Sequence, residues 1–244
     1  MKYDSKLFKW KHFSGMIIMW LVRWYGRYAL SYNDLREIAA ERGLKINRST
    51  ICRWVHEYGK LLAKLIKPHL KTTSKSWRLD ETYIKIKGVW HYLYRAVDKQ
   101  GQTLDWMLSR NRNKKAAKRF FKKTLSNKHI TKPSVINVDK APAFVPAHAE
   151  LQKSGDLDPD TKLRRVKYLN IRRVKYLNNS VENDHKFIKS KSRYRQWYQS
   201  FETAEATIDT IETMRMIQKG QLRYVDRDVC AQNKVINQIF GLAA

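Results

Sequence analysis

Cysteine is scarce in this chain, and its scarcity excludes two classes of protein. Only Cys52 and Cys230 occur among 244 residues, far apart and without the CxxC spacing of a metal-binding pair. A framework of disulfides and a cysteine zinc cluster are therefore both excluded. This usage fits a protein that works in a reducing cytoplasm, where we expect this one.

Acidic residues and long apolar runs are also few. Asp and Glu total 22 against 50 Lys and Arg, which gives a net charge of +28 spread along the whole chain. Such a surplus favours a polyanion as partner, nucleic acid above all, although a ribosomal or membrane-surface protein has similar charge. Eight Trp and thirteen Tyr argue against a purely charge-neutralising protein. The apolar run 16–22 covers about a third of a membrane span, so no membrane partner is expected.

Residues 1–70 predict a helical DNA-binding domain. Ser31 can cap one short helix, Gly43 can end it and Asn47 can cap the next. Small Ala39 suits a close crossing of two helices, so the pair resembles a helix-turn-helix motif. The second helix would then present four residues to the DNA: Arg48, Ser49, Thr50 and Arg53. The alternative is a helical hairpin whose arginines are merely solvated.

A basic linker at 71–76 separates this domain from a region of different periodicity. Residues 77–200 predict the order β-β-β-α-β-α-β-α-α, with a hairpin turn at Lys87-Gly88. This order implies an α/β fold, a mixed sheet flanked by helices. The helices of 201–244 are expected to pack on that core.

Three acids stand in contexts typical of a metal site. Asp80 lies in a predicted strand, Asp139 ends the short predicted strand 135–138, and Glu182 begins a predicted helix. Neighbouring strand residues point to opposite faces, so Asp80 and Glu81 cannot serve one site, and the sequence alone does not choose between them. Asp and Glu are oxygen ligands that suit Mg²⁺ or Mn²⁺. The alternative is that each acid is an ordinary surface group.

Three more groups follow Glu182 on one helical stripe, and each is a candidate DNA contact. They are His185, Lys186 and Lys189, at the third, fourth and seventh positions after the glutamate. His185 either orients a phosphate or merely neutralises the acidic helix.

The segments LDETYIKIKG, VDKAPAF and KYLNNSVENDH resemble the DDE transposases of insertion-sequence family six, over nearly the whole chain. The resemblance implies an RNase H-like core in which Asp80, Asp139 and Glu182 are catalytic and hold two Mg²⁺ or Mn²⁺ ions. It resolves Asp80 over Glu81 and places Lys189 against the terminal DNA. It further implies that the partner is double-stranded DNA, both the terminal inverted repeats and the target. The implied reaction is strand cleavage and strand transfer with cointegrate products, by at least a homodimer and without a nucleotide cofactor.

One departure from the family pattern precedes the glutamate. RRVKYLN occurs at 164–170 and again at 172–178, so the copies are offset by eight residues. The interval between Asp139 and Glu182 contains 42 residues, which is eight more than the family usually has. The eight extra residues equal the offset between the two copies. We expect the second copy to occupy the sheet while the first bulges, carrying Arg164, Arg165 and Lys167 into solvent. If the first copy pairs in the sheet instead, eight extra residues separate Glu182 from the sheet and the site is lost.

Two alternatives to an active transposase stay open at this point. One is a catalytically impaired remnant, or a repressor of the same element that only binds DNA. The other is a related RNase H-like nuclease, against which the helix-turn-helix argues.

Overall fold

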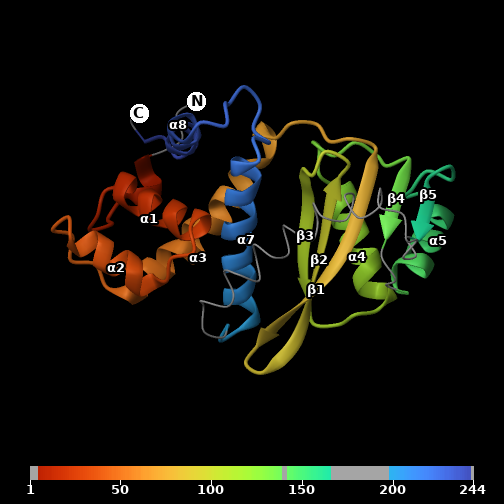
Figure 1. Ribbon diagram of the computed structural model, residues 1–244, viewed down its shortest axis with the longest axis horizontal. Coiled ribbons are helices and arrows are strands. Elements are labelled where there is room, and N and C mark those ends of the chain that lie inside the picture. The colour runs from red at the N-terminus through yellow and green to blue at the C-terminus, as the bar shows by residue number, and fades with distance from the viewer. Residues whose placement is uncertain (1–4, 139–141, 166–197, 243–244) are drawn as a thin grey trace, which may run out of the picture. The chain divides into compact units, whose positions relative to one another are not determined.

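The structure, a computed structural model, describes residues 5–138, 142–165 and 198–242. The chain divides into two compact units (Figure 1). The helical unit contains residues 1–71 and 191–244, and the sheet unit contains residues 72–190. Among the described helices, none is long and apolar enough to cross a membrane.

The helical unit joins helices from both ends of the chain. Its α-helices are α1 (Gly15–Arg27), α2 (Tyr32–Ala40), α3 (Arg48–Leu65), α7 (Phe201–Gln218) and α8 (Val229–Ile239). Two short 3₁₀ helices, Ser5–Phe8 and Lys67–His69, complete it.

The turn between α2 and α3 forms as the sequence predicts. The Ser31 hydroxyl accepts a hydrogen bond from the Asp34 amide, and the Asp34 carboxylate accepts one from the Ser31 amide. This capping box satisfies two amides at the start of α2. Gly43 adopts a φ of 73° in the turn, and Asn47 occupies the N-cap position of α3. Ala39 is fully buried, as a close crossing of α2 and α3 requires.

α7 is the first helix of residues 201–244, for which packing on the sheet core stays a prediction, and its described partners lie in the helical unit. In the structure α7 packs against α1 and α3 and belongs to the helical unit. The cause is a close crossing between α3 and α7. A Cβ built on Gly59 would lie 1.7 Å from the Thr210 hydroxyl oxygen, which itself donates to the Val55 carbonyl at 3.1 Å. Sequence periodicity shows that a helix has an apolar face but does not identify its partner.

The sheet unit has the predicted mixed α/β architecture. Its elements are β1 (Ser76–Ile86), β2 (Val89–Asp98), β3 (Thr103–Ser109), α4 (Lys114–Leu125), β4 (Val135–Val138), α5 (Phe144–Lys153) and β5 (Lys162–Arg165). The strand order is β3-β2-β1-β4-β5. β1 and β3 run antiparallel to β2, while β4 is parallel to both β1 and β5. The expected RNase H-like fold class is thereby confirmed for the described elements.

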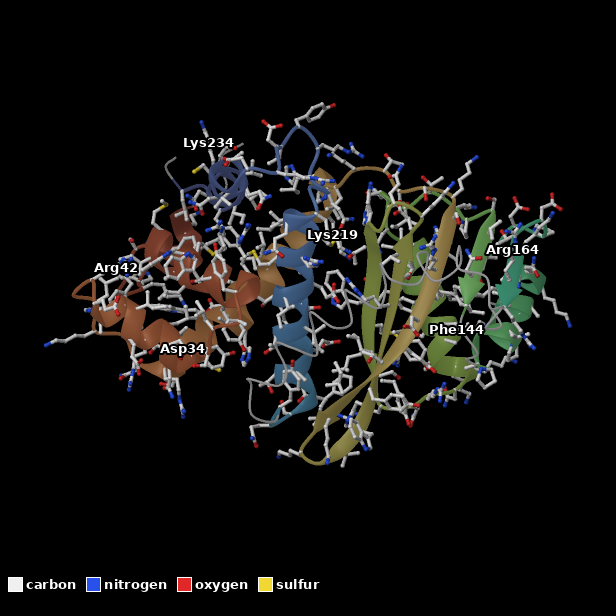
Figure 2. The ribbon with its side chains drawn as sticks, viewed as in Figure 1. Asp34, Arg42, Phe144, Arg164, Lys219 and Lys234 are labelled. Carbon is white, nitrogen blue, oxygen red and sulfur yellow. The ribbon has the colours of Figure 1, made fainter. Side chains whose placement is uncertain are left out.

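One face of the sheet packs on α4 and α5. Trp77 and Leu79 of β1 contribute to this core, together with Phe120 of α4 and Phe144 of α5. Figure 2 shows Phe144 among the strands and helices of this unit, away from the edge strand that carries Arg164. Inward residues of β1 therefore alternate with residues on the opposite face, which fixes where its acids point.

The close crossing of α3 and α7 generates a stability prediction. We expect Gly59→Ala to lower the unfolding free energy by about 1–3 kcal/mol, because the new methyl group overpacks the contact with Thr210. Thermal or urea unfolding of the purified protein measures the effect.

The double variant Gly59→Ala/Thr210→Ala is the matched control. It removes the clashing hydroxyl, so part of the loss caused by Gly59→Ala should be recovered. Full additivity of the two single changes would contradict the proposed crossing.

Candidate active site and DNA-binding helix

Asp80 and Glu81 point to opposite faces of β1, and the structure shows what each faces. Glu81 shares the helix-covered side with Trp77 and Leu79. Its carboxylate forms an ion pair with Arg112, which precedes the N-cap residue of α4, and the Glu81 side chain is only 6% exposed. Glu81 therefore has a structural partner, and this separates it from the neighbouring aspartate.

Burial controls the electrostatics around Glu81. Burial raises the pKa of the Glu81 carboxyl, and the Arg112 guanidinium opposes that rise. Tyr94 lies directly across the β1–β2 ladder from Glu81. Burial first, and the Glu81 charge second, raise the pKa of the Tyr94 phenol to about 12. These groups form a buried cluster beneath α4, a setting suited to holding the strand rather than to binding a hydrated ion.

Asp80 lies on the other face, with Arg78 and Thr82. Its side chain is half-buried, and its Oδ1 accepts a hydrogen bond from the Glu81 amide at 2.7 Å. Arg95 of β2 is its cross-strand neighbour and donates to the Thr103 hydroxyl at 3.2 Å. Burial lowers the pKa of Arg78, against the opposing effect of Asp98. The surroundings of Asp80 are thus polar and cationic.

The end of β4 lies beside this position. Leu79 and Val138 form the last described pair of the parallel β1–β4 ladder. Asp80 follows Leu79 on β1, and Asp139 follows Val138 in the sequence. In open α/β sheets, ligands gather beyond the carboxyl ends of parallel strands.

The remaining predicted site residues are outside the described part of the chain. They are Asp139, Glu182, His185, Lys186 and Lys189. Within residues 5–138, 142–165 and 198–242, no group of three His, Cys, Asp or Glu side chains could hold a metal ion. The structure therefore describes the surroundings of one of the three predicted catalytic acids.

The structure corrects the expectation about the repeat. β5 contains Arg164 and Arg165, the first two residues of the first copy, and they pair with Asn137 and Val138 of β4. The first copy begins in the sheet instead of bulging from it, although both arginine side chains are exposed. The following residues of the repeat, Lys167 included, are outside the described part of the chain.

The chain before β5 explains this register. The Thr161 hydroxyl donates to the Pro133 carbonyl at 2.8 Å, and the Lys162 amide donates to the Ser134 carbonyl at 2.9 Å. These bonds fix the start of β5 next to the start of β4, so the chain enters the sheet with the first copy. The expectation that the second copy occupies the sheet was based only on its connection to Glu182, and these hydrogen bonds before β5 were not predicted.

The second helix of the helix-turn-helix has the two faces predicted for it. Ile51, Trp54 and Val55 are buried. On the outer side the four predicted DNA-facing residues are exposed or half-exposed: Arg48, Ser49, Thr50 and Arg53. The Arg53 guanidinium donates to the Thr50 hydroxyl at 3.3 Å, which holds its charge above the first turn of α3.

Known proteins resemble this chain over most of its length. The DDE domain family matches residues 74–221, more than half of the chain. The transposase for insertion sequence-like element IS431mec of Staphylococcus aureus is 40% identical over 216 residues, covering 88% of this chain and 90% of that protein. The transposase for insertion sequence element IS257 in transposon Tn4003, from the same species, matches equally well. The HTLV-2 integrase catalytic core domain in complex with magnesium aligns over 58% of this chain and 85% of its own, with 20% identity and a TM-score of 0.42.

The matched domain and the relatives define the protein class, a DDE transposase of a bacterial insertion element. More particularly, the chain belongs to insertion-sequence family six, with transposases of the IS431 and IS257 type. The resemblance stated from the sequence motifs is therefore confirmed.

Arg112 is a residue of the site that the sequence motifs do not predict. It lies 31 residues after Glu81, and its guanidinium also donates to the Tyr83 hydroxyl at 3.0 Å. The only signal in the sequence is the strand alternation, which turns Glu81 toward the helices, where a buried acid requires a partner.

The Glu81–Arg112 pair yields a test of its structural role. Glu81→Ala and Arg112→Ala should each lower the unfolding free energy by about 1–3 kcal/mol, because each leaves a partly buried partner without its bond. Urea unfolding of both single variants and the double variant gives the coupling energy. A coupling below about 0.3 kcal/mol would show that the two side chains act independently.

Proposed function

We propose that this protein binds the terminal inverted repeats of its own insertion element and catalyses metal-dependent strand cleavage and strand transfer, with cointegrates as products. The observation that supports this most is the position of Asp80. It is the residue of β1 directly after the last described β1–β4 pair, on the face opposite the Glu81–Arg112 pair. Family membership supplies the reaction class.

The residues fit a site for divalent metal. Asp80 is a half-buried carboxylate on a polar face, and the parallel register leads from Val138 directly into Asp139 in the sequence. Asp80, Asp139 and Glu182 would provide hard oxygen ligands, which suit Mg²⁺ or Mn²⁺. Two such ions, when bound, activate an attacking oxygen and stabilise the leaving oxygen in an in-line displacement. Arg78 lies on the same face of β1 and supplies positive charge for the phosphate backbone.

Recognition of the element's ends is assigned to α3. Arg48 and Arg53 are exposed on the outer face of a helix whose inner face is buried, which is the geometry of a helix that enters a major groove. The Arg53–Thr50 hydrogen bond orients one guanidinium before DNA arrives. His185, Lys186 and Lys189 are proposed to contact the terminal DNA near the cleaved bond.

The repeat supports a second proposal about this particular chain. The first copy begins in β5, and we infer from this that the second copy is an insertion between the sheet and Glu182. We propose that this insertion impairs strand transfer and leaves the binding of DNA ends intact. This observation favours the impaired-remnant or repressor alternative for the intact chain, within the same transposase family.

The deciding experiment is a Mg²⁺-dependent strand-transfer assay on the element's own end DNA. We expect deletion of 171–178 to raise strand transfer by about 100-fold or more, since misplacing a catalytic group by about 1 Å can cost that much. Deleting 164–171 gives the same protein sequence, so no second deletion is needed. Equal activity of the intact chain and the deletion would show that the second copy is a tolerated loop.

The role of Asp80 is tested in the more active of these two backgrounds. Asp80→Asn should abolish strand transfer, because it removes a negatively charged oxygen ligand while preserving the shape of the side chain. Binding to the inverted repeats, measured by gel shift, should stay unchanged. Glu81→Gln is the matched control one residue away, and it should retain strand transfer.

The outcomes separate the alternatives. Loss of strand transfer in Glu81→Gln with full activity in Asp80→Asn would reverse the assignment of the two acids. If every variant binds the ends but none transfers strands, the DNA-binding repressor explains the protein better. The double variant Arg48→Ala/Arg53→Ala should lose end binding in either case.

A further inference from the structure

The β1–β2 hairpin continues beyond the neighbouring strands as a two-stranded ribbon (Figure 1). The β2–β3 ladder reaches Tyr92 opposite Ser109, whereas the β1–β2 ladder continues to Ile86 opposite Val89. Lys87 and Gly88 both have positive φ, 45° and 83°, as a two-residue hairpin turn of this type requires. The ribbon is therefore hydrogen-bonded up to its tip.

One side of this ribbon carries a group of aromatic and cationic side chains, here called the ribbon face: Tyr83, Lys85, Trp90, Tyr92 and the adjoining Arg112. Strand alternation places it on the same side as Glu81, so Asp80 points the other way. Tyr83 is 47% exposed and Trp90 is 55% exposed, in contrast to buried Ile84 and Ile86 on the reverse side.

The aromatic rings of the ribbon face are held in place by one another and by cations. Tyr83 makes an edge contact with Trp90 at 6.1 Å between centroids and a tilted contact with Tyr92 at 5.3 Å. The Lys85 ammonium lies 5.5 Å from the centre of the Trp90 ring, and the Arg112 guanidinium lies 5.9 Å from that of Tyr83. Ordering these rings before a ligand arrives lowers the entropy cost of binding.

The charge of the ribbon favours one kind of partner. The sequence 83–92 reads YIKIKGVWHY, with two lysines and no acid, and the charge of the adjoining Arg112 is paired with Glu81. A second copy of this chain, of net charge +28, would bring another strongly basic molecule to a basic surface. A nucleic acid offers phosphates to the lysines and flat bases to the rings.

We propose that the ribbon face binds an unpaired DNA strand, with bases stacked on Tyr83 and Trp90 and phosphates near Lys85, Lys87 and Arg112. Exposed aromatic rings beside positive charge are the general means by which proteins bind single strands. DNA as partner rests on the proposed function. Asp80 lies on the opposite face, so the DNA bound by the ribbon face is a different segment from the one cleaved at Asp80.

The test measures binding by fluorescence polarisation, with a labelled 20-nucleotide single strand and the duplex of the same sequence. Stacking of one base on an aromatic side chain contributes enough to change affinity by about tenfold. Trp90→Ala should therefore weaken single-strand binding about tenfold and duplex binding less than twofold, and Trp90→Phe should restore most of the loss. Tyr224→Ala, which removes a fully exposed aromatic ring of the helical unit, is the matched control and should leave both affinities unchanged.

Salt dependence tests the lysines. Lys85→Gln/Lys87→Gln should reduce the slope of log affinity against log salt for the single strand by about 1.4, which is two phosphate contacts. The control Lys128→Gln/Lys153→Gln removes the same charge from exposed positions elsewhere in the sheet unit, and it should change the slope less.

Three results would overturn the proposal: equal losses for single strand and duplex in Trp90→Ala, no loss at all, or the same slope change in both lysine pairs. A shift of the oligomeric state in sedimentation of Trp90→Ala would instead identify the ribbon face as an interface between copies. The measurements need no strand transfer, so they can fail while the Asp80 assignment holds, and the reverse is also possible.

Discussion

The ion pair between Glu81 and Arg112 is the interaction on which the arrangement of the site depends. Strand alternation allows only one of two adjacent acids to face the helices, and the ion pair fixes Glu81 there. Asp80 then points to the opposite face, at the end of the β1–β4 ladder. The same pair anchors the segment before α4 and positions Arg112 over Tyr83. One partly buried contact therefore orients both the proposed catalytic face and the ribbon face.

Local signals predicted the elements of the fold well. Ser31, Gly43 and the Lys87-Gly88 turn have the roles that their chemistry implies, because capping and positive φ depend on a few neighbouring residues. The partner of α7 was not predicted, because it depends on Gly59 meeting Thr210 across about 150 residues of sequence. The choice between Asp80 and Glu81 likewise required either a family resemblance or the position of Arg112, which only the folded chain reveals.

The repeat shows where sequence reasoning and structure differ. An offset of eight residues preserves the alternation of faces, so either copy presents the same side chains to the core. The residues just before the copies are also alike in one respect, since Leu163 and Ile171 are both apolar. Leu163 packs against the core of the sheet unit, a place that Ile171 would fill in the other register. Side-chain patterning therefore barely distinguishes the two registers.

The difference between the registers comes from the residues just before the two copies. Entry of the first copy retains the hydrogen bond from the Thr161 hydroxyl to the Pro133 carbonyl, adjacent to the bond from the Lys162 amide to the Ser134 carbonyl. Entry of the second copy would put Leu169 and Asn170 in these two places, so an amide could still reach Ser134 but no hydroxyl would reach Pro133. It would also add eight residues to a loop, and each doubling of loop length costs only about 0.6 kcal/mol. A net hydrogen bond contributes about 1 kcal/mol, comparable to the loop term. The balance is therefore small, and the local anchor before β5, not the demand of the distant Glu182, decides which copy enters the sheet.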